Sequence, residues 1–119
     1  MLLSELQRLF ARDTVLLFEY INEEGYAFTY GEAMRSPEQA EIYAKSGKGI
    51  KDSLHCKRLA VDINLFKDGV YLDDPKEYEK FAFFWEHLSP SNRAGYNFKS
   101  RPDANHFERN DKPSKDSGK

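Results

Sequence analysis

A His-x6-Asp pair, His55 and Asp62, constrains this chain more than any other feature, because an Asp-x2-His pair, Asp103 and His106, follows it near the C-terminus. Two histidines and one aspartate make the three protein ligands of a hydrolytic zinc site, which leaves the fourth position to water, whereas structural zinc sites use four ligands. The remaining carboxylate, Asp103, precedes His106 by three residues and is the candidate general base.

The two members of the first pair can meet at one metal ion only if the chain bends between them. Seven residues of extended strand would separate His55 from Asp62 by about 23 Å at ~3.3 Å per residue. Metal bonds to these side chains are only about 2.0–2.2 Å long. We therefore expect a turn between the two residues.

The residues around these positions resemble three motifs of a known family, the LAS zinc peptidases, which include D-alanyl-D-alanine carboxypeptidases and dipeptidases. Residues 53–62, SLHCKRLAVD, are similar to the family signature S-x-H-x-x-G-x-A-x-D. Residues 102–108, PDANHFE, resemble the second motif, in which an acidic residue stands three before a zinc histidine. Arg35-Ser36 with Gln39 resembles the R-S-x-x-x-Q element that opens the domain.

The three motifs stand in the family order over about residues 26–108. The resemblance is closest to the L-alanyl-D-glutamate endopeptidases of bacteriophages and prophages, which cut the stem peptide of peptidoglycan. It implies an α+β fold of the hedgehog/DD-peptidase type, in which a small antiparallel sheet carries the zinc site and helices flank the sheet. It also implies a peptidoglycan stem peptide as substrate and Zn²⁺ as cofactor.

The roles implied by the resemblance divide into zinc ligands, catalytic groups and substrate contacts. They are the zinc ligands His55, Asp62 and His106, the catalytic residues Asp103 and Arg35, and the substrate-binding residues Gln39 and Ser53. In such a site the base takes a proton from the attacking water and returns it to the leaving amine, while the arginine stabilises the developing oxyanion.

One position departs from the family signature, because Arg58 stands where the motif has glycine. Glycine enters positive-φ conformations without steric cost. We therefore expect the turn after His55 to use ordinary dihedral angles or to move by one residue. Arg58 can also place a cation beside the site.

Two other functions remain open. A D-alanyl-D-alanine carboxypeptidase shares all four site residues, and a non-catalytic zinc domain that binds a partner, as in hedgehog signalling, shares the fold. The presence of Asp103 argues against the non-catalytic zinc domain, because a structural zinc site needs no general base. The short segment between the motifs, with one helix and a turn over 75–92, leaves little material for a lid. This favours an open groove and an endopeptidase.

Two residues near the site have open roles. Glu108 shares a strand face with His106 and either supports that ring or faces solvent. Cys56, the only cysteine, excludes an intrachain disulfide and is most simply a small buried side chain.

Length and charge limit the remaining functions. A chain of 119 residues with 39% hydrophobic residues fits one domain, here a catalytic domain over 1–108 followed by a disordered polar tail over 109–119. A net charge of -2 gives no reason to expect nucleic-acid binding, and we expect a monomer.

The N-terminal residues predict no export signal. Charged and polar residues interrupt the apolar positions of residues 1–10, which is typical of an amphipathic helix rather than a signal peptide. No apolar run is long enough to cross a membrane. The resemblance then implies an enzyme made in the bacterial cytoplasm that reaches the cell wall during phage or prophage lysis.

Hydrophobic spacing predicts the elements that would carry these motifs. We expect one or two short helices over 2–22 with a break near Asp13-Thr14, a helix that begins at Ser36-Pro37 and continues over 38–44, and a helix over 75–88 with Trp85 in the core and His87 exposed. We expect strands over 26–33, 59–66, 70–72, 95–98 and 106–108.

Overall fold

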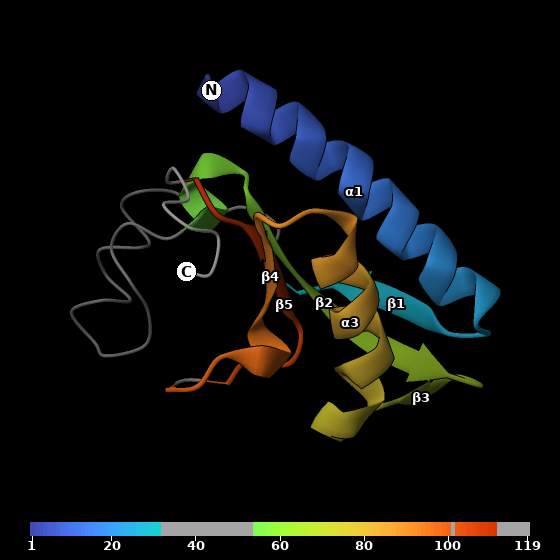
Figure 1. Ribbon diagram of the computed structural model, residues 1–119. Coiled ribbons are helices and arrows are strands. Elements are labelled where there is room, and N and C mark those ends of the chain that lie inside the picture. The colour runs from blue at the N-terminus through green and yellow to red at the C-terminus, as the bar shows by residue number, and fades with distance from the viewer. Residues whose placement is uncertain (32–53, 101, 112–119) are drawn as a thin grey trace.

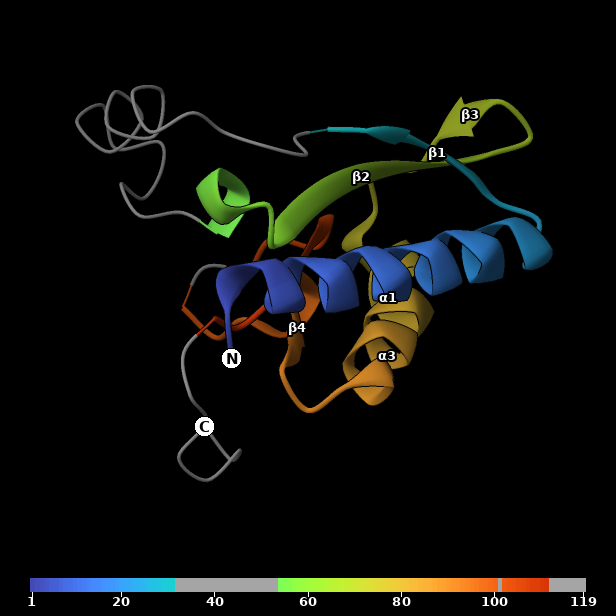
Figure 2. The same cartoon turned by 90° about the horizontal axis from the view of Figure 1, so that it is seen from above.

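A computed structural model describes residues 1–31, 54–100 and 102–111 of the chain. Within these ranges the protein has an α+β fold, in which two α-helices pack on one face of a five-stranded antiparallel sheet (Figures 1 and 2). This confirms the fold class predicted from the sequence. The helix expected over 38–44 lies outside the described residues.

The elements follow the predicted order along the chain. The helices are α1 (Leu3–Glu23) and α3 (Glu79–Leu88), with short 3-10 helices η1 (Leu54–Lys57), η2 (Pro75–Tyr78) and η3 (Gly95–Asn97). The strands are β1 (Ala27–Tyr30), β2 (Ala60–Lys67), β3 (Val70–Tyr71), β4 (Asn92–Ala94) and β5 (His106–Arg109).

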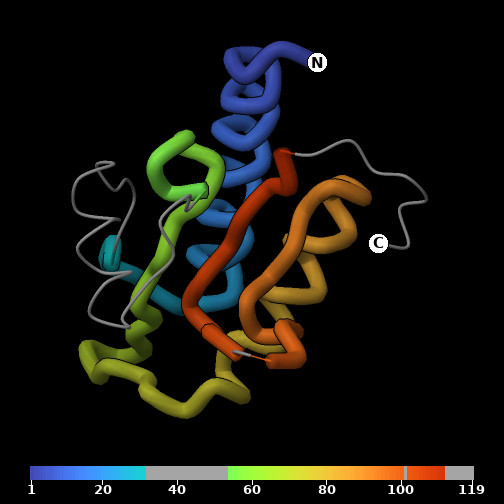
Figure 3. The backbone as a smooth tube through the Cα atoms, turned by 90° about the vertical axis from the view of Figure 1, so that its left-hand side faces the viewer, coloured from blue at the N-terminus to red at the C-terminus, as the bar shows by residue number. Residues whose placement is uncertain are grey.

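Strand β2 organises the sheet, because its residues pair with β1, β3 and β5. The sheet order is β1-β2-β5-β4, and Figure 3 shows β2, β5 and β4 side by side. Successive residues of a strand point to opposite faces of the sheet. Val61, Ile63 and Leu65 are buried against the helices, so Asp62 points away from them. The sheet therefore separates an apolar face from a polar one.

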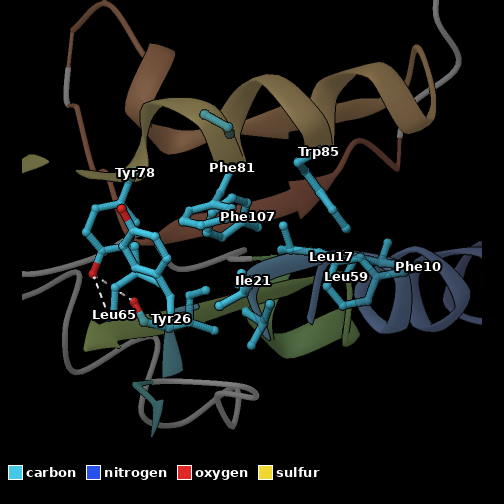
Figure 4. Packing of buried hydrophobic residues seen from close by; sticks show 14 residues of the cluster. Phe10, Leu17, Ile21, Tyr26, Leu59, Leu65, Tyr78, Phe81, Trp85 and Phe107 are labelled. Carbon is cyan, nitrogen blue, oxygen red and sulfur yellow. Dashed lines mark hydrogen bonds between the residues drawn. The ribbon is translucent and has the colours of Figure 1, made fainter. Parts of the chain in front are cut away.

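The core fills the space between the sheet and the two helices (Figure 4). Trp85 of α3 is fully buried between Phe10 and Phe107, with edge-to-face ring contacts at centroid distances of 5.6 and 6.0 Å. Its indole Nε1 donates to the carbonyl oxygen of Glu108 at 3.0 Å. Burial of each large apolar side chain contributes about 1.5–3 kcal/mol. The core thus fixes α3 and β5 relative to each other.

The predicted break in the first helix is wrong, because α1 runs unbroken from Leu3 to Glu23. Asp13 is buried in the middle of this helix. Its Oδ1 accepts a hydrogen bond from Arg12 Nη2 at 3.1 Å. Its Oδ2 accepts one from Asn92 Nδ2 of β4, also at 3.1 Å. The aspartate that suggests a helix end is therefore an attachment point between α1 and the sheet.

Two predicted strand boundaries also differ. Residues 95–98 are not a strand, since pairing with β5 ends at Ala94 and the next residues form η3. At the C-terminal end, β5 continues through Arg109, which the sequence assigned to the polar tail. The Arg109 side chain is buried and donates to Ser89 Oγ at 3.3 Å. Of the predicted tail over 109–119, residues 112–119 lie outside the described residues.

Among the helices that the structure describes, none is both long enough and apolar enough to span a membrane.

Candidate metal centre

The turn that brings His55 toward the sheet is the C-terminal cap of η1. The backbone N–H of Leu59 donates to the Leu54 carbonyl at 3.0 Å, and the N–H of Arg58 donates to the His55 carbonyl at 3.2 Å. Arg58 itself has a φ of 58°. These bonds form a Schellman motif with a left-handed residue at the position where glycine is usual.

The expectation for Arg58 is therefore wrong. The turn neither uses ordinary dihedral angles nor moves by one residue, because Arg58 itself adopts a left-handed conformation that glycine enters without steric cost. A left-handed conformation costs an L-residue with a side chain about 1–2 kcal/mol. The two backbone hydrogen bonds and the packing of the buried Leu59 hold the turn in this conformation.

We expect the Arg58→Gly protein to be about 1 kcal/mol more stable than the Arg58→Ala protein. Both variants lose the guanidinium, so their difference isolates the backbone strain. Urea denaturation of the two proteins in the presence of a chelator measures it without a contribution from bound metal. Equal stabilities, or a less stable glycine variant, would contradict the left-handed turn.

The pairing of β2 with β5 brings the other two candidate ligands together. Asp62 and His106 are directly opposite each other in the antiparallel register. Side chains at such positions share one face of the sheet, with Cβ atoms about 4.5–5.5 Å apart. On the other edge of β2, the Gly31 N–H donates to the Asp62 carbonyl at 2.7 Å. The backbone of Asp62 is therefore held from both sides.

The three side chains converge on one point on the polar face of the sheet. His106 Nδ1 lies 3.0 Å and His55 Nε2 lies 3.4 Å from the same oxygen, Asp62 Oδ1. One donor atom from each residue lies within 4.8 Å of the others. Both histidines are buried, and their ring centroids are 5.2 Å apart. Two imidazole nitrogens and a carboxylate around one point fit a Zn²⁺ ion with an open fourth position.

These contacts shift the pKa values of Asp62 and His106. Burial alone would raise the pKa of Asp62, but hydrogen bonds with the rings of His106 and His55 outweigh burial and lower this pKa to about 2. Burial would lower the pKa of His106, but its hydrogen bonds with Asp62 and Glu108 outweigh burial and raise this pKa to about 9. Without metal, His106 is therefore a cation between two carboxylates at neutral pH.

A metal ion must displace that proton from His106, so metal affinity depends on pH. The affinity should increase as pH rises, by about tenfold per unit for one proton, and should level off only near the His106 pKa of about 9. An unperturbed histidine would stop competing above about pH 6.5. Competition with a chelator of known pH dependence, between pH 6 and 9, measures this slope. A zinc affinity that is constant from pH 7 to 9 would contradict the shifted pKa.

Asp103 lies in the loop before β5, and Gly95 fixes the position of this loop. The Asp103 N–H donates to the Gly95 carbonyl at 2.9 Å, and the Asp103 carbonyl accepts from the His106 N–H at 3.0 Å. A Cβ atom at Gly95 would lie only 2.1 Å from the Asp103 carbonyl oxygen. The loop can approach η3 this closely only because residue 95 is glycine.

The Asp103 carboxyl group is not one of the three clustered donors, but the charges of the cluster shift its pKa. The residue is at the surface, but partial desolvation of the carboxyl and the nearby Asp62 carboxylate raise its pKa, against the opposing effect of His106 and His55. A carboxylate with a raised pKa is a stronger proton acceptor. Asp103 thus has the electrostatic setting expected of a base.

The other candidates of the sequence fall outside this cluster. Arg35, Gln39 and Ser53 lie outside the described residues. Cys56 is half-buried in η1 and is not among the three clustered donors in the described part of the chain. His87 is exposed on α3, as predicted.

Two further residues form a chain of polar contacts with the His106 ring. Glu108, whose role the sequence left open, is buried, and its Oε1 lies 2.6 Å from His106 Nε2. Arg93, which the sequence analysis did not single out, pairs with Glu108 Oε2 from β4. The period of two in β5 indicates that Glu108 and His106 share a face, but no local pattern indicates that β4 places Arg93 there.

These features define an α+β fold with a three-donor candidate metal centre on the sheet face opposite the helices. A solved structure, the L-Ala D-Glu endopeptidase ChiX of Serratia marcescens, has a similar fold, with a TM-score of 0.70 and 21% sequence identity. The match covers 89% of this chain and 84% of that chain. No protein-family model matches this sequence, and no curated protein is significantly similar to it.

Proposed function

We propose that this chain is a zinc-dependent peptidoglycan peptidase that hydrolyses the L-alanyl-D-glutamate bond of the stem peptide. The observation that carries the proposal is the convergence of His55, Asp62 and His106 on one point, within a fold shared with an L-Ala D-Glu endopeptidase. The sequence motifs around these residues resemble the same class of enzyme and support the proposal independently of the fold comparison.

The chain would bind the metal through His55, Asp62 and His106. A metal bound there supplies a Lewis acid, which polarises the scissile carbonyl and increases the acidity of water. The two buried rings and the Asp62 carboxylate orient the donors before the metal arrives, because each ring already contacts the same carboxylate oxygen.

Asp103 would act as the general base. The carboxylate accepts the proton of the attacking water and then returns it to the leaving amine, so that one residue serves both steps. The raised pKa of Asp103 favours uptake of the proton. The backbone contacts with Gly95 hold the Asp103 loop beside the cluster.

The roles of Arg35, Gln39 and Ser53 rest on the family resemblance. We propose that Arg35 stabilises the oxyanion of the tetrahedral intermediate and that Gln39 and Ser53 contact the stem peptide. The resemblance likewise supports a place for the enzyme in phage or prophage lysis of the bacterial cell wall.

The segment that separates the two ligand motifs supports an endopeptidase, which cuts within the peptidoglycan polymer, over a carboxypeptidase, which cuts at a free C-terminus. From β3 to η3 this segment builds the hairpin, the core helix α3 and the strand β4. These elements are parts of the sheet and the core, so this segment adds no separate lid element. A groove open at both ends accepts a cross-linked stem peptide, whereas a carboxypeptidase needs a dedicated cation for the terminal carboxylate.

Digestion of purified sacculi tests the proposal. We expect the turbidity to fall and new N-terminal glutamate to appear, as measured by mass spectrometry of the released fragments. The Asp103→Asn protein and chelated wild-type protein serve as negative controls. Release of free D-alanine from intact sacculi would instead identify a D-alanyl-D-alanine carboxypeptidase. No cleavage by a zinc-loaded protein would favour a non-catalytic zinc-binding domain.

A further inference from the structure

We infer that Glu108, held by Arg93, is a positioning residue that fixes the His106 ring with Nδ1 facing the metal. The inference rests on the proposed role of His106 as a metal ligand. It assigns the orientation of that ligand, and the choice of its protonated nitrogen, to the buried Glu108 of β5 and its ion-pair partner Arg93 of β4.

The contacts of the His106 ring support this assignment directly. Nδ1 lies 3.0 Å from Asp62 Oδ1, on the side of the three-donor cluster, and Nε2 lies 2.6 Å from Glu108 Oε1, on the other side. An ionised carboxylate only accepts hydrogen bonds, so Nε2 must carry the proton in this contact. When His106 binds a metal as neutral imidazole, the lone pair is then on Nδ1.

The sheet register explains why Glu108 is in position to do this. Glu108 follows His106 by two residues in β5, so both side chains lie on the same face of the sheet. Glu108 is also directly opposite Arg93 of β4. The Trp85 indole binds the Glu108 carbonyl from the core side at 3.0 Å. The backbone at Glu108 is therefore fixed independently of the metal.

The two oxygens of Glu108 are divided between two partners. Oε1 contacts the His106 ring, and Oε2 forms an ion pair with the Arg93 guanidinium. The Glu108 side chain is only 8% exposed, and a buried carboxylate without partners would be costly. Arg93 compensates the charge and occupies Oε2, so Oε1 is the oxygen that faces His106.

A simpler role for this pair would be to join β4 to β5. That role requires the ion pair alone and does not involve the His106 ring. A histidine ligand that donates its second N–H to a carboxylate is a recurrent arrangement in metal sites, and loss of the carboxylate commonly lowers metal affinity 10–100-fold. The two roles therefore predict different metal affinities.

The experiment compares zinc binding by Glu108→Ala, Glu108→Gln and a control, Glu86→Ala. Glu86 of α3 also ties two elements together, since it accepts from the Ala94 N–H at 2.9 Å, but it has no described contact with the His106 ring. Zinc affinity is measured by chelator competition. Long-range proton–nitrogen NMR spectra of the zinc-loaded proteins report the nitrogen that carries the His106 proton and the exchange of that proton.

We expect Glu108→Ala to bind one zinc with an affinity about 10–100-fold below that of the wild type, and to expose the His106 Nε2 proton to rapid exchange. Glu108→Gln should retain most of the affinity and the protected proton, because its amide oxygen still accepts. Glu86→Ala should bind zinc as the wild type does. A Glu108→Ala protein with wild-type affinity would overturn the inference.

Removal of Glu108 alone leaves the Arg93 guanidinium, which is 39% exposed, without its carboxylate partner, and this can destabilise the fold. The double variant Arg93→Met/Glu108→Met removes both charges and keeps similar side-chain volumes. It should fold and show the same loss of affinity, whereas wild-type affinity in this variant would again overturn the inference. If His106→Ala kept its zinc, the ligand assignment in the proposed function would be wrong. If His106→Ala lost its zinc while the Glu108 variants kept wild-type affinity, only the inferred role of Glu108 would be wrong.

Discussion

Replacement of His55, Asp62 or His106 by alanine should remove the bound metal and abolish hydrolysis. The wild-type protein is expected to carry one zinc per chain, and a hydrolytic site holds its zinc through three protein ligands. Loss of one of the three should weaken binding more than the 10–100-fold loss that is typical for a supporting residue. Elemental analysis of the purified variants measures the zinc content, and chelation of the wild type should abolish its activity.

His87→Ala is the matched control for the two histidine variants. His87 is exposed on α3, and its Nδ1 lies 2.8 Å from the Phe83 carbonyl of the same helix. This variant should keep both zinc and activity. Full zinc occupancy in the His106→Ala protein would refute the assignment of the metal centre, whatever its activity.

The second large effect is expected for Asp103→Asn, which should keep its zinc and its fold but lose about 10²-fold or more in turnover. The amide has the shape of the carboxyl group but cannot take a proton from water. The backbone hydrogen bonds of residue 103 with Gly95 and His106 do not involve its side chain, so the loop should stay in place. Zinc content and steady-state hydrolysis of stem peptides separate the two effects.

Asp73→Asn provides the corresponding control, because Asp73 is an exposed aspartate between β3 and η2. It should hydrolyse the substrate at the wild-type rate. If the Asp103→Asn protein lost its zinc, Asp103 would be a ligand instead of a base. If it hydrolysed stem peptides at the wild-type rate, the proposed mechanism would be wrong.

Much of this molecule follows from patterns within short segments of the chain. The alternating apolar residues of β2, the turn at Asp68-Gly69 and the amphipathic face of α3 predict their elements, since each pattern reflects the period of one local structure. The chemistry of the candidate centre is also local. Histidine and aspartate side chains can bind zinc in any fold, so the His-x6-Asp and Asp-x2-His pairs suggest a metal site before the fold is known.

Other features of the fold depend on contacts between segments that are distant in the sequence. A local pattern cannot predict them, because it does not include the residue on the other side of the contact. Asp13 favours a helix end by itself, yet α1 continues through it because Asn92 satisfies its carboxylate. Arg58 disfavours a left-handed turn by itself, yet the caps of η1 impose one. Whether Asp62 meets His106 depends on the register of β2 and β5, and a slip of one residue would move the carboxylate to the opposite face of the sheet. The sequence alone determined which side chains can bind the metal, and the tertiary structure decided where they meet, because a strand register is fixed by the packing of both its faces.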